Sequence, residues 1–170
     1  MPDADLSADF YLLTQELAVS AGMQAYEISN HARPGEESRH NLLYWRYGEY
    51  VGVGAGAHGR LLVDNVRYAT ATQKQPEKWL EQVTKSGSGL ITNDKLTWEE
   101  ESDEYLLMGL RLREGIALDR YHQLSGRQLD QKQIRELSNI GFVKILANGN
   151  LRVTDKGWPV LDAVVADLAM

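Results

Sequence analysis

The sequence predicts an α+β fold in which a short α/β segment precedes a helical domain with a β-hairpin. Up to residue 75, strand-like runs follow a helix, but they are too few to close a sheet. From Thr97 onward, capping signals mark several helices, and Asn148-Gly149 between alternating runs is a strong hairpin signal. We therefore expect an α/β segment over 1–75, a connecting helix and linker over 76–96, and a winged-helix-like domain over 97–170.

The first part is expected to begin with a helix over 6–21. Phe10, Leu13 and Leu17 recur there at helical spacing, and a glycine follows as a C-terminal stop. Tyr50–Val53 reads as a buried strand that runs directly into a glycine-rich loop. Further strands are expected over 23–29, 61–63 and 66–68, the last two joined by a turn at Asp64-Asn65.

The remaining elements are predicted mainly by their capping residues. Gln75-Pro76 opens a helix through about Thr84, because proline suits the first helical position. Thr97 and Glu100 form a capping-box pattern ahead of a long helix that is expected to end near Gly115. After it we expect a short helix capped by Asp119 and ended at Gly126, a helix capped by Asp130 with Ile134 and Leu137 facing inward, the Asn148-Gly149 hairpin, and a final helix over roughly 156–168.

Composition excludes several classes of protein. The chain has 170 residues, no cysteine and a net charge of −6. Without thiolates it offers no zinc–cysteine cluster and no ordinary iron–sulfur ligand set, and its acidity argues against nucleic acid as a partner. No window approaches the ~18 apolar residues of a transmembrane segment, and the first nine residues carry three aspartates and no basic side chain. We therefore expect a cytoplasmic protein.

Chemically useful side chains concentrate in the stretch from Ser38 to Gly59. It holds two histidines, two arginines, four aromatic residues and five glycines. Glycines such as Gly54 and Gly56 after a strand let a backbone approach a ligand closely. The same residues also suit a tight strand end packed against a neighbour, and the loop alone does not separate these interpretations.

The histidines of this stretch have two interpretations as well. His40 is followed by Asn41, Tyr44 and Trp45. Its imidazole could ligate iron, and the aromatic rings could lie against a flat ligand. Alternatively, His40 bonds to the backbone while both rings belong to the core. His58, inside the glycine loop, could contact a ligand or hold the turn.

Together these motifs resemble a known family. "YEISNHARPGEESRHNLLYW" followed by "GVGAGAHG" is similar to the oxygen-independent coproporphyrinogen III oxidase-like radical S-adenosylmethionine (SAM) proteins. The resemblance is strongest to their heme chaperone branch, whose HNxxYW motif stands here as His40, Asn41, Tyr44 and Trp45. It covers nearly the whole chain, including the part from Thr97 onward.

The resemblance implies that 1–75 is the last part of a partial (β/α)₆ radical SAM barrel. It implies heme or another tetrapyrrole as partner, with His40 as the iron ligand. In the full-length family a CxxxCxxC motif holds a [4Fe–4S] cluster that cleaves S-adenosylmethionine, and this chain has no such motif. The implied cofactor-binding residues are His40, Asn41, Tyr44, Trp45, Gly54, Gly56 and His58, with no catalytic residue among them.

We therefore expect the C-terminal portion of a protein of heme metabolism that binds and delivers heme. Its other partners would be the missing N-terminal half of the barrel or, through the exposed barrel edge, a second copy. Alone it should be inactive, and whether the parent is an enzyme stays undecided. Two alternatives remain: a winged-helix nucleic-acid-binding module, with 131–139 as the recognition helix, and a purely structural docking domain.

Overall fold

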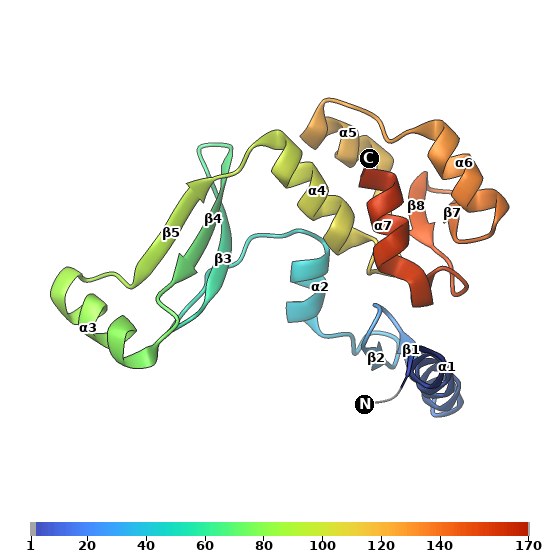
Figure 1. Ribbon diagram of the computed structural model, residues 1–170, viewed down its shortest axis with the longest axis horizontal. Helices are drawn as coiled ribbons and strands as arrows, with labels where there is room; N and C mark the ends of the chain where they lie inside the picture. Colours follow the sequence, from blue (N-terminus) through green and yellow to red (C-terminus); the bar gives the residue numbers. More distant parts are fainter. Residues whose placement is uncertain (1–2, 170) are drawn as a thin grey trace.

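The computed structural model describes residues 3–169 as a body and an arm that projects from it, with helix α1 (Ala4–Ser20) beside the body (Figure 1). Helices and strands occur in both halves of the chain, which confirms the α+β class. Met1, Pro2 and Met170, which the predicted domains include, lie outside the described residues.

The arm is an antiparallel sheet in the order β3-β4-β5. The predicted hairpin is confirmed, because Asp64 and Asn65 turn the chain with φ of 50° and 61°. Both residue types tolerate this left-handed conformation. The bounds are β3 (His58–Val63), β4 (Val66–Thr72) and β5 (Leu90–Lys95).

Helix α3 (Pro76–Ser86) joins β4 to β5 at the far end of the arm (Figure 1). It begins at the predicted proline and ends at Gly87, which has a φ of 74°. The sequence analysis placed only a linker after this helix. The chain instead continues as β5, which pairs with β4 from Lys95 back to Leu90.

The predicted buried strand at Tyr50–Val53 is wrong. Tyr50 forms only an isolated bridge with Arg60, and Val51 and Val53 are 69% and 86% exposed. A Cβ atom on Gly52 would lie 2.4 Å from the His58 carbonyl oxygen. The glycine therefore packs against β3, while the valines on either side of it face solvent. In this segment an apolar residue type is thus no sign of a buried position.

Helix α1 is confirmed, but its apolar face is not covered. The Asp3 carboxylate caps it by accepting a hydrogen bond from the Leu6 N–H at 2.9 Å. Phe10 and Leu17 are 54% and 61% exposed. Beyond α1, the strand predicted over 23–29 is reduced to β1 (Gln24–Ala25), which pairs with β2 (His31–Ala32).

The body begins with helix α4 (Trp98–Gly109), and its predicted capping box is present. The helix ends six residues before Gly115, where the sequence analysis placed its end. The reason is a close crossing, because a Cβ atom on Gly109 would lie 2.3 Å from the Ile116 side chain. The next helix, α5 (Leu118–Ser125), has Ala117 at its N-cap, so Asp119 lies in the first turn instead of capping it.

The rest of the body closely follows the expected order of elements. Asp130 caps α6, and Ile134 and Leu137 are buried as predicted. The Asn148-Gly149 hairpin is confirmed and forms a sheet in the order β6-β8-β7. The final helix begins later than expected, after a 3₁₀ turn that contains Pro159. The bounds are β6 (Ile116–Ala117), α6 (Gln131–Asn139), β7 (Val143–Ile145), β8 (Asn150–Val153), η1 (Trp158–Val160) and α7 (Leu161–Ala169).

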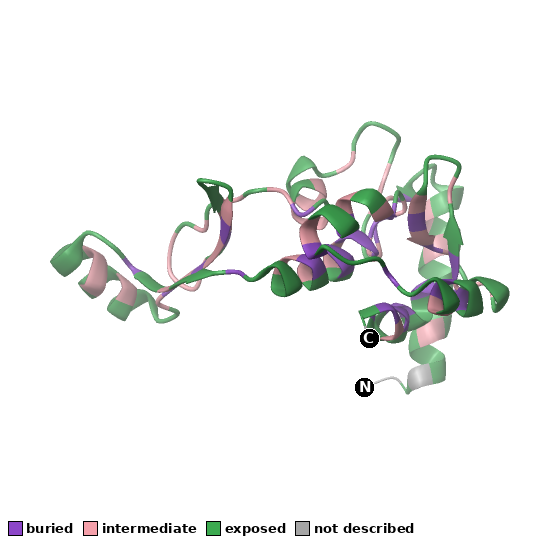
Figure 2. Cartoon of the chain, turned by 90° about the horizontal axis from the view of Figure 1, so that it is seen from above, coloured by how far each residue is buried: buried purple, intermediate pink, exposed green. Residues whose placement is uncertain are grey.

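Buried side chains gather in the body, while the arm is mostly exposed or half-buried (Figure 2). Leu106, Leu110 and Ile116 are fully buried at the centre of the core. The body thus forms a packed base from which the arm and the short helix α2 (Arg39–Trp45) extend. Within residues 3–169, no helix is both long and apolar enough to span a membrane.

Candidate functional site

Helix α2 carries most of the predicted site residues and is anchored at both ends. At its start, the Ser38 hydroxyl accepts a hydrogen bond from the Asn41 N–H at 3.3 Å. At its end, the Arg46 guanidinium binds both carboxylate oxygens of Glu114 at 2.7 and 2.8 Å. These contacts matter because no residue of α2 is buried. The helix is therefore held by its ends more than by an apolar face.

Three rings form what we call the aromatic stack: His40, Tyr44 and Tyr50. His40 and Tyr44 lie four residues apart on one face of α2, with ring centroids 4.6 Å apart in an edge-to-face arrangement. The Tyr50 ring lies 4.1 Å from that of Tyr44. The His40 ring is exposed and receives no hydrogen bond from the described part of the chain. An imidazole in this position is available to ligate a metal.

The structure places Asn41 and Trp45 away from this stack. The Asn41 amide donates a hydrogen bond to the Tyr26 hydroxyl at 3.1 Å. Trp45, five residues after His40, turns toward the body, where the Arg111 guanidinium lies 5.6 Å from its ring. Of the four motif residues, His40 and Tyr44 therefore share one face, while the other two connect α2 to its surroundings.

Gly54 and Gly56 lie in the glycine loop, residues Gly52–Gly59. Both adopt left-handed backbone conformations, with φ of 99° and 70°. The Thr72 hydroxyl holds this loop, because it donates to the Gly54 carbonyl at 2.6 Å and accepts from the Ala57 N–H at 2.9 Å. The loop thus follows directly from Tyr50 and ends at the start of β3, where His58 is exposed.

Sequence reasoning missed Tyr50 as part of the site and Thr72 as its support. Tyr50 was assigned to a buried strand, although an aromatic residue so close to the HNxxYW motif was a usable signal. Thr72 lies 18 residues from the carbonyl it binds, and no local pattern connects the two positions.

A polar hub joins the arm to the body beside the stack. The Arg60 guanidinium donates to the Glu104 carboxylate at 2.9 and 2.6 Å, and the Tyr47 hydroxyl donates to it at 2.8 Å. Burial raises the pKa of Glu104, but the hydrogen bonds from Arg60 and Tyr47 outweigh it and hold that pKa below its ordinary value of 4.5. Burial and the bond to Glu104 raise the pKa of Tyr47. Glu104 is therefore an anion that binds the Arg60 guanidinium of the arm and the Tyr47 hydroxyl.

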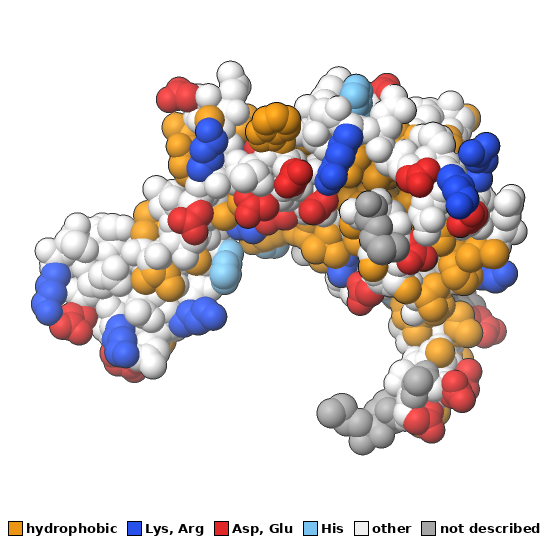
Figure 3. All heavy atoms as spheres, turned by 45° about the horizontal axis from the view of Figure 1, so that its top comes forward, with side chains coloured by type: hydrophobic (Ala, Val, Ile, Leu, Met, Phe, Trp, Pro, Cys, Tyr) orange, Lys and Arg blue, Asp and Glu red, His pale blue; other side chains and the backbone are white. Residues whose placement is uncertain are grey.

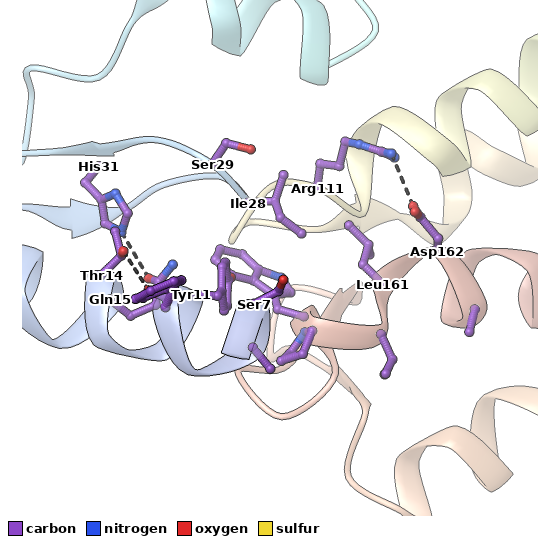
Figure 4. A pocket seen from close by; sticks show the side chains of 16 residues that line it. Ser7, Tyr11, Thr14, Gln15, Ile28, Ser29, His31, Arg111, Leu161 and Asp162 are labelled. Carbon is purple, nitrogen blue, oxygen red and sulfur yellow. Dashed lines mark hydrogen bonds and ion pairs between the residues drawn. The ribbon is translucent and has the colours of Figure 1, made fainter. Parts of the chain in front are cut away.

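A cleft of about 850 Å³ lies elsewhere, between α1 and the η1–α7 segment (Figure 4). His31 is hydrogen-bonded there to Gln15 at 3.1 Å, and Arg111 pairs with Asp162 at 3.4 Å. None of the predicted cofactor-binding residues lines it. Because the His31 imidazole in this cleft is already hydrogen-bonded to Gln15, we place the candidate site at the aromatic stack.

The wider surface around these elements is hollowed. The arm and α1 stand on either side of the body and leave a broad concavity between them, with hydrophobic side chains on its inner surface (Figure 3). Over residues 3–169, no group of three or more histidine, aspartate or glutamate side chains could hold a metal ion. The imidazole of the stack therefore belongs to no such group among these residues.

Comparison with known proteins gives consistent relationships. A family model described as HemN C-terminal domain matches residues 96–160. The chain is 33% identical to "Radical S-adenosyl methionine domain-containing protein 1, mitochondrial" of Bos taurus, over 98% of this chain and 40% of that protein. It is 32% identical to "Heme chaperone HemW" of Bacillus subtilis (strain 168), over 84% of this chain and 38% of that protein. The chain thus spans about two fifths of the length of these relatives.

A solved structure shares the fold. The coproporphyrinogen III oxidase HemN from Escherichia coli, described as a radical SAM enzyme, superposes with a TM-score of 0.71. The superposition covers 99% of this chain and 42% of that one at 17% sequence identity. At this identity the likeness extends to the fold alone.

Proposed function

This chain belongs to the coproporphyrinogen III oxidase-like radical SAM family, whose C-terminal part it matches, and on that basis we propose that it binds heme for delivery. The observation that carries the proposal is the exposed His40 imidazole at the end of the aromatic stack. An exposed histidine beside flat aromatic surface suits an iron porphyrin, because one nitrogen meets the metal while rings lie against the macrocycle.

The residues of the site divide into contacts and supports. His40 is the metal ligand, and Tyr44 offers ring surface next to it. Gly54, Gly56 and His58 follow Tyr50 in the glycine loop, and we propose that they face the ligand from there. Asn41 and Trp45 fix α2 to its surroundings through Tyr26 and the body. His40 would hold the iron of heme through an imidazole nitrogen.

The residues present do not fit an iron–sulfur cluster, because such clusters are held by cysteine thiolates and the chain has no cysteine. We propose that the cluster and S-adenosylmethionine belong to other parts of the full-length family members. In this view residues 1–75 complete a partial barrel, 97–170 form a winged-helix-like domain, and this chain alone carries out no radical chemistry. The exposed apolar face of α1 supports a partner in the missing half of the barrel.

Nucleic-acid binding receives no support from the predicted recognition helix. In α6, Lys132 pairs with Glu136 at 3.8 Å, and Asp130 caps the helix. With a net charge of −6, the chain lacks the positive surface on which binding to phosphates depends.

The test is a titration with ferric heme that follows the Soret band. The variants are His40→Ala and, as a control, His122→Ala, an exposed histidine in the last turn of α5. We expect the control to match the wild type and His40→Ala to lose the spectrum of an imidazole-ligated heme, with affinity roughly tenfold lower or more. Identical spectra and affinities for all three proteins would show that His40 is not the ligand.

A further inference from the structure

A continuous set of contacts connects Glu104 in the body to the aromatic stack. Glu104 binds the Arg60 guanidinium through both of its carboxylate oxygens. The backbones of Arg60 and Tyr50 exchange two hydrogen bonds, each of 2.9 Å. The Tyr50 ring packs on Tyr44, and Tyr44 packs on His40. These contacts link Glu104 and Arg60 to the proposed iron ligand without a break.

The ion pair between Arg60 and Glu104 is well suited to fix the position of the Arg60 side chain relative to α4. Its side chains are only 20% and 27% exposed, and its two bonds are short and parallel. Bidentate, charge-assisted bonds of this kind restrict geometry more than single bonds do. Arg60 also donates to the Gly59 carbonyl at 3.0 Å. Three of the five N–H donors of the guanidinium are thus used within the protein.

Beside this anchor, the segment around Tyr50 is held by the Glu49 carboxylate, which accepts a hydrogen bond from the Leu62 N–H at 2.9 Å, and by the Thr72 hydroxyl in the glycine loop. The residues that follow Tyr50 form no strand, and Val51 and Val53 are largely exposed. The bridge to Arg60 is the backbone pairing that places Tyr50. This bridge is thus the direct backbone link between β3 and the ring that packs on Tyr44.

We infer that Glu104 is a positioning residue for heme: through Arg60 it holds Tyr50 against Tyr44 and so orients His40. The inference rests on the proposed function and adds a residue of the C-terminal body to a site whose rings all come from the N-terminal half of the chain. Within the described residues the hydrogen bonds of Glu104 go to Arg60 and Tyr47 and not to these rings, so we expect its effect to pass through Arg60 and through the pairing with Tyr50.

The experiment is a double-variant cycle on ferric heme binding with Glu104→Gln, Arg60→Gln and the combined variant. We expect each single variant to lower the His40-dependent affinity about fivefold to tenfold, which corresponds to the loss of one charge-assisted contact. The combined variant should be no weaker than either single one, because both changes break the same link. The Soret band and the electron paramagnetic resonance spectrum of ferric heme should also broaden, since His40 no longer has one orientation.

A matched control is Asp155→Asn, which weakens the pair between Asp155 and Arg113 (2.6 Å) elsewhere in the body. It should leave the heme spectrum unchanged. Amide exchange at Leu106 in the core reports whether each variant is folded, so a loss of fold is not mistaken for a loss of position.

The outcomes separate the two claims. If wild type and His40→Ala bind heme identically, the proposed function fails, and with it this inference, before any Glu104 variant is measured. If heme binding depends on His40 but folded Glu104→Gln and Arg60→Gln match the wild type in affinity and spectrum, the inference alone is overturned. Additive losses in the combined variant would also overturn it, because Glu104 would then act by another route.

Discussion

Replacing Gly52 with alanine tests whether the close approach of the glycine loop to β3 sets the position of Tyr50. An added Cβ atom would lie 2.4, 2.7 and 2.9 Å from the carbonyl oxygen, carbonyl carbon and amide nitrogen of His58. All three are backbone atoms, so no side-chain rotation relieves the contact. Ordinary van der Waals contact begins at 3.4 Å, so the segment must move by about 1 Å away from β3.

The size of the effect follows from the bonds next to this contact. A shift of this size strains the two 2.9 Å hydrogen bonds between Tyr50 and Arg60. Each contributes about 0.5–1.5 kcal/mol, so local opening should become easier by about 1–3 kcal/mol. The φ of Gly52 lies outside the left-handed region, and the change therefore adds no backbone strain of its own.

Amide hydrogen exchange measures this opening residue by residue. We expect the Tyr50 and Arg60 amides to exchange about fivefold to 100-fold faster in Gly52→Ala, while the core of the body keeps its protection. Gly22→Ala is the control, since it strains a left-handed glycine (φ 76°) with open space around it, after α1. Unchanged protection at Tyr50 and Arg60 in Gly52→Ala would refute the steric argument.

Two more changes probe the surroundings of the stack. Thr72→Val should increase exchange at the Ala57 amide and weaken the arm by about 1–3 kcal/mol in urea unfolding, because a part-buried N–H and carbonyl lose their partner. Thr70→Val is the control and should be nearly neutral, because the described residues offer no hydrogen-bond partner for the Thr70 hydroxyl. For Glu104, the lowered pKa means that its stabilisation is present above 4.5 and lost as the pH falls through the folded-state pKa. Between about pH 5 and pH 3 the wild type should therefore lose stability faster than Glu104→Gln, and parallel curves would contradict this.

The parts of the fold that the sequence predicts are those specified by neighbouring residues. The capping box of Thr97 and Glu100 needs only four positions, and both of its hydrogen bonds form. The Asn148-Gly149 and Asp64-Asn65 turns are set by residues that tolerate a positive φ. His40 and Tyr44 meet because residues four apart share a helix face.

What the sequence does not predict depends on contacts between distant segments. Helix α4 ends at Gly109 because Ile116 crosses it closely, and nothing between these residues marks the stop. The 50–53 run has one glycine, Gly52, between two valines, and only its proximity to β3 decides that the glycine faces inward while the valines face solvent. The hub is the extreme case, since Arg60 and Glu104 are 44 residues apart. Contacts between residues so far apart produce no periodic pattern in a single sequence.

These distant contacts also explain why the site cannot be assigned to one half of the chain. Helix α2 has seven residues and none of them is buried, whereas isolated helices shorter than about 12–15 residues are marginal in water. Its C-terminal end is held by Glu114, and Arg120 donates to the Arg46 carbonyl at 3.0 Å, both from the body. The stack thus consists of residues before the segment that matches the HemN C-terminal domain, while that segment supplies the groups that hold it. In this arrangement, the segment that matches the HemN C-terminal domain supports the helix that carries the proposed heme ligand.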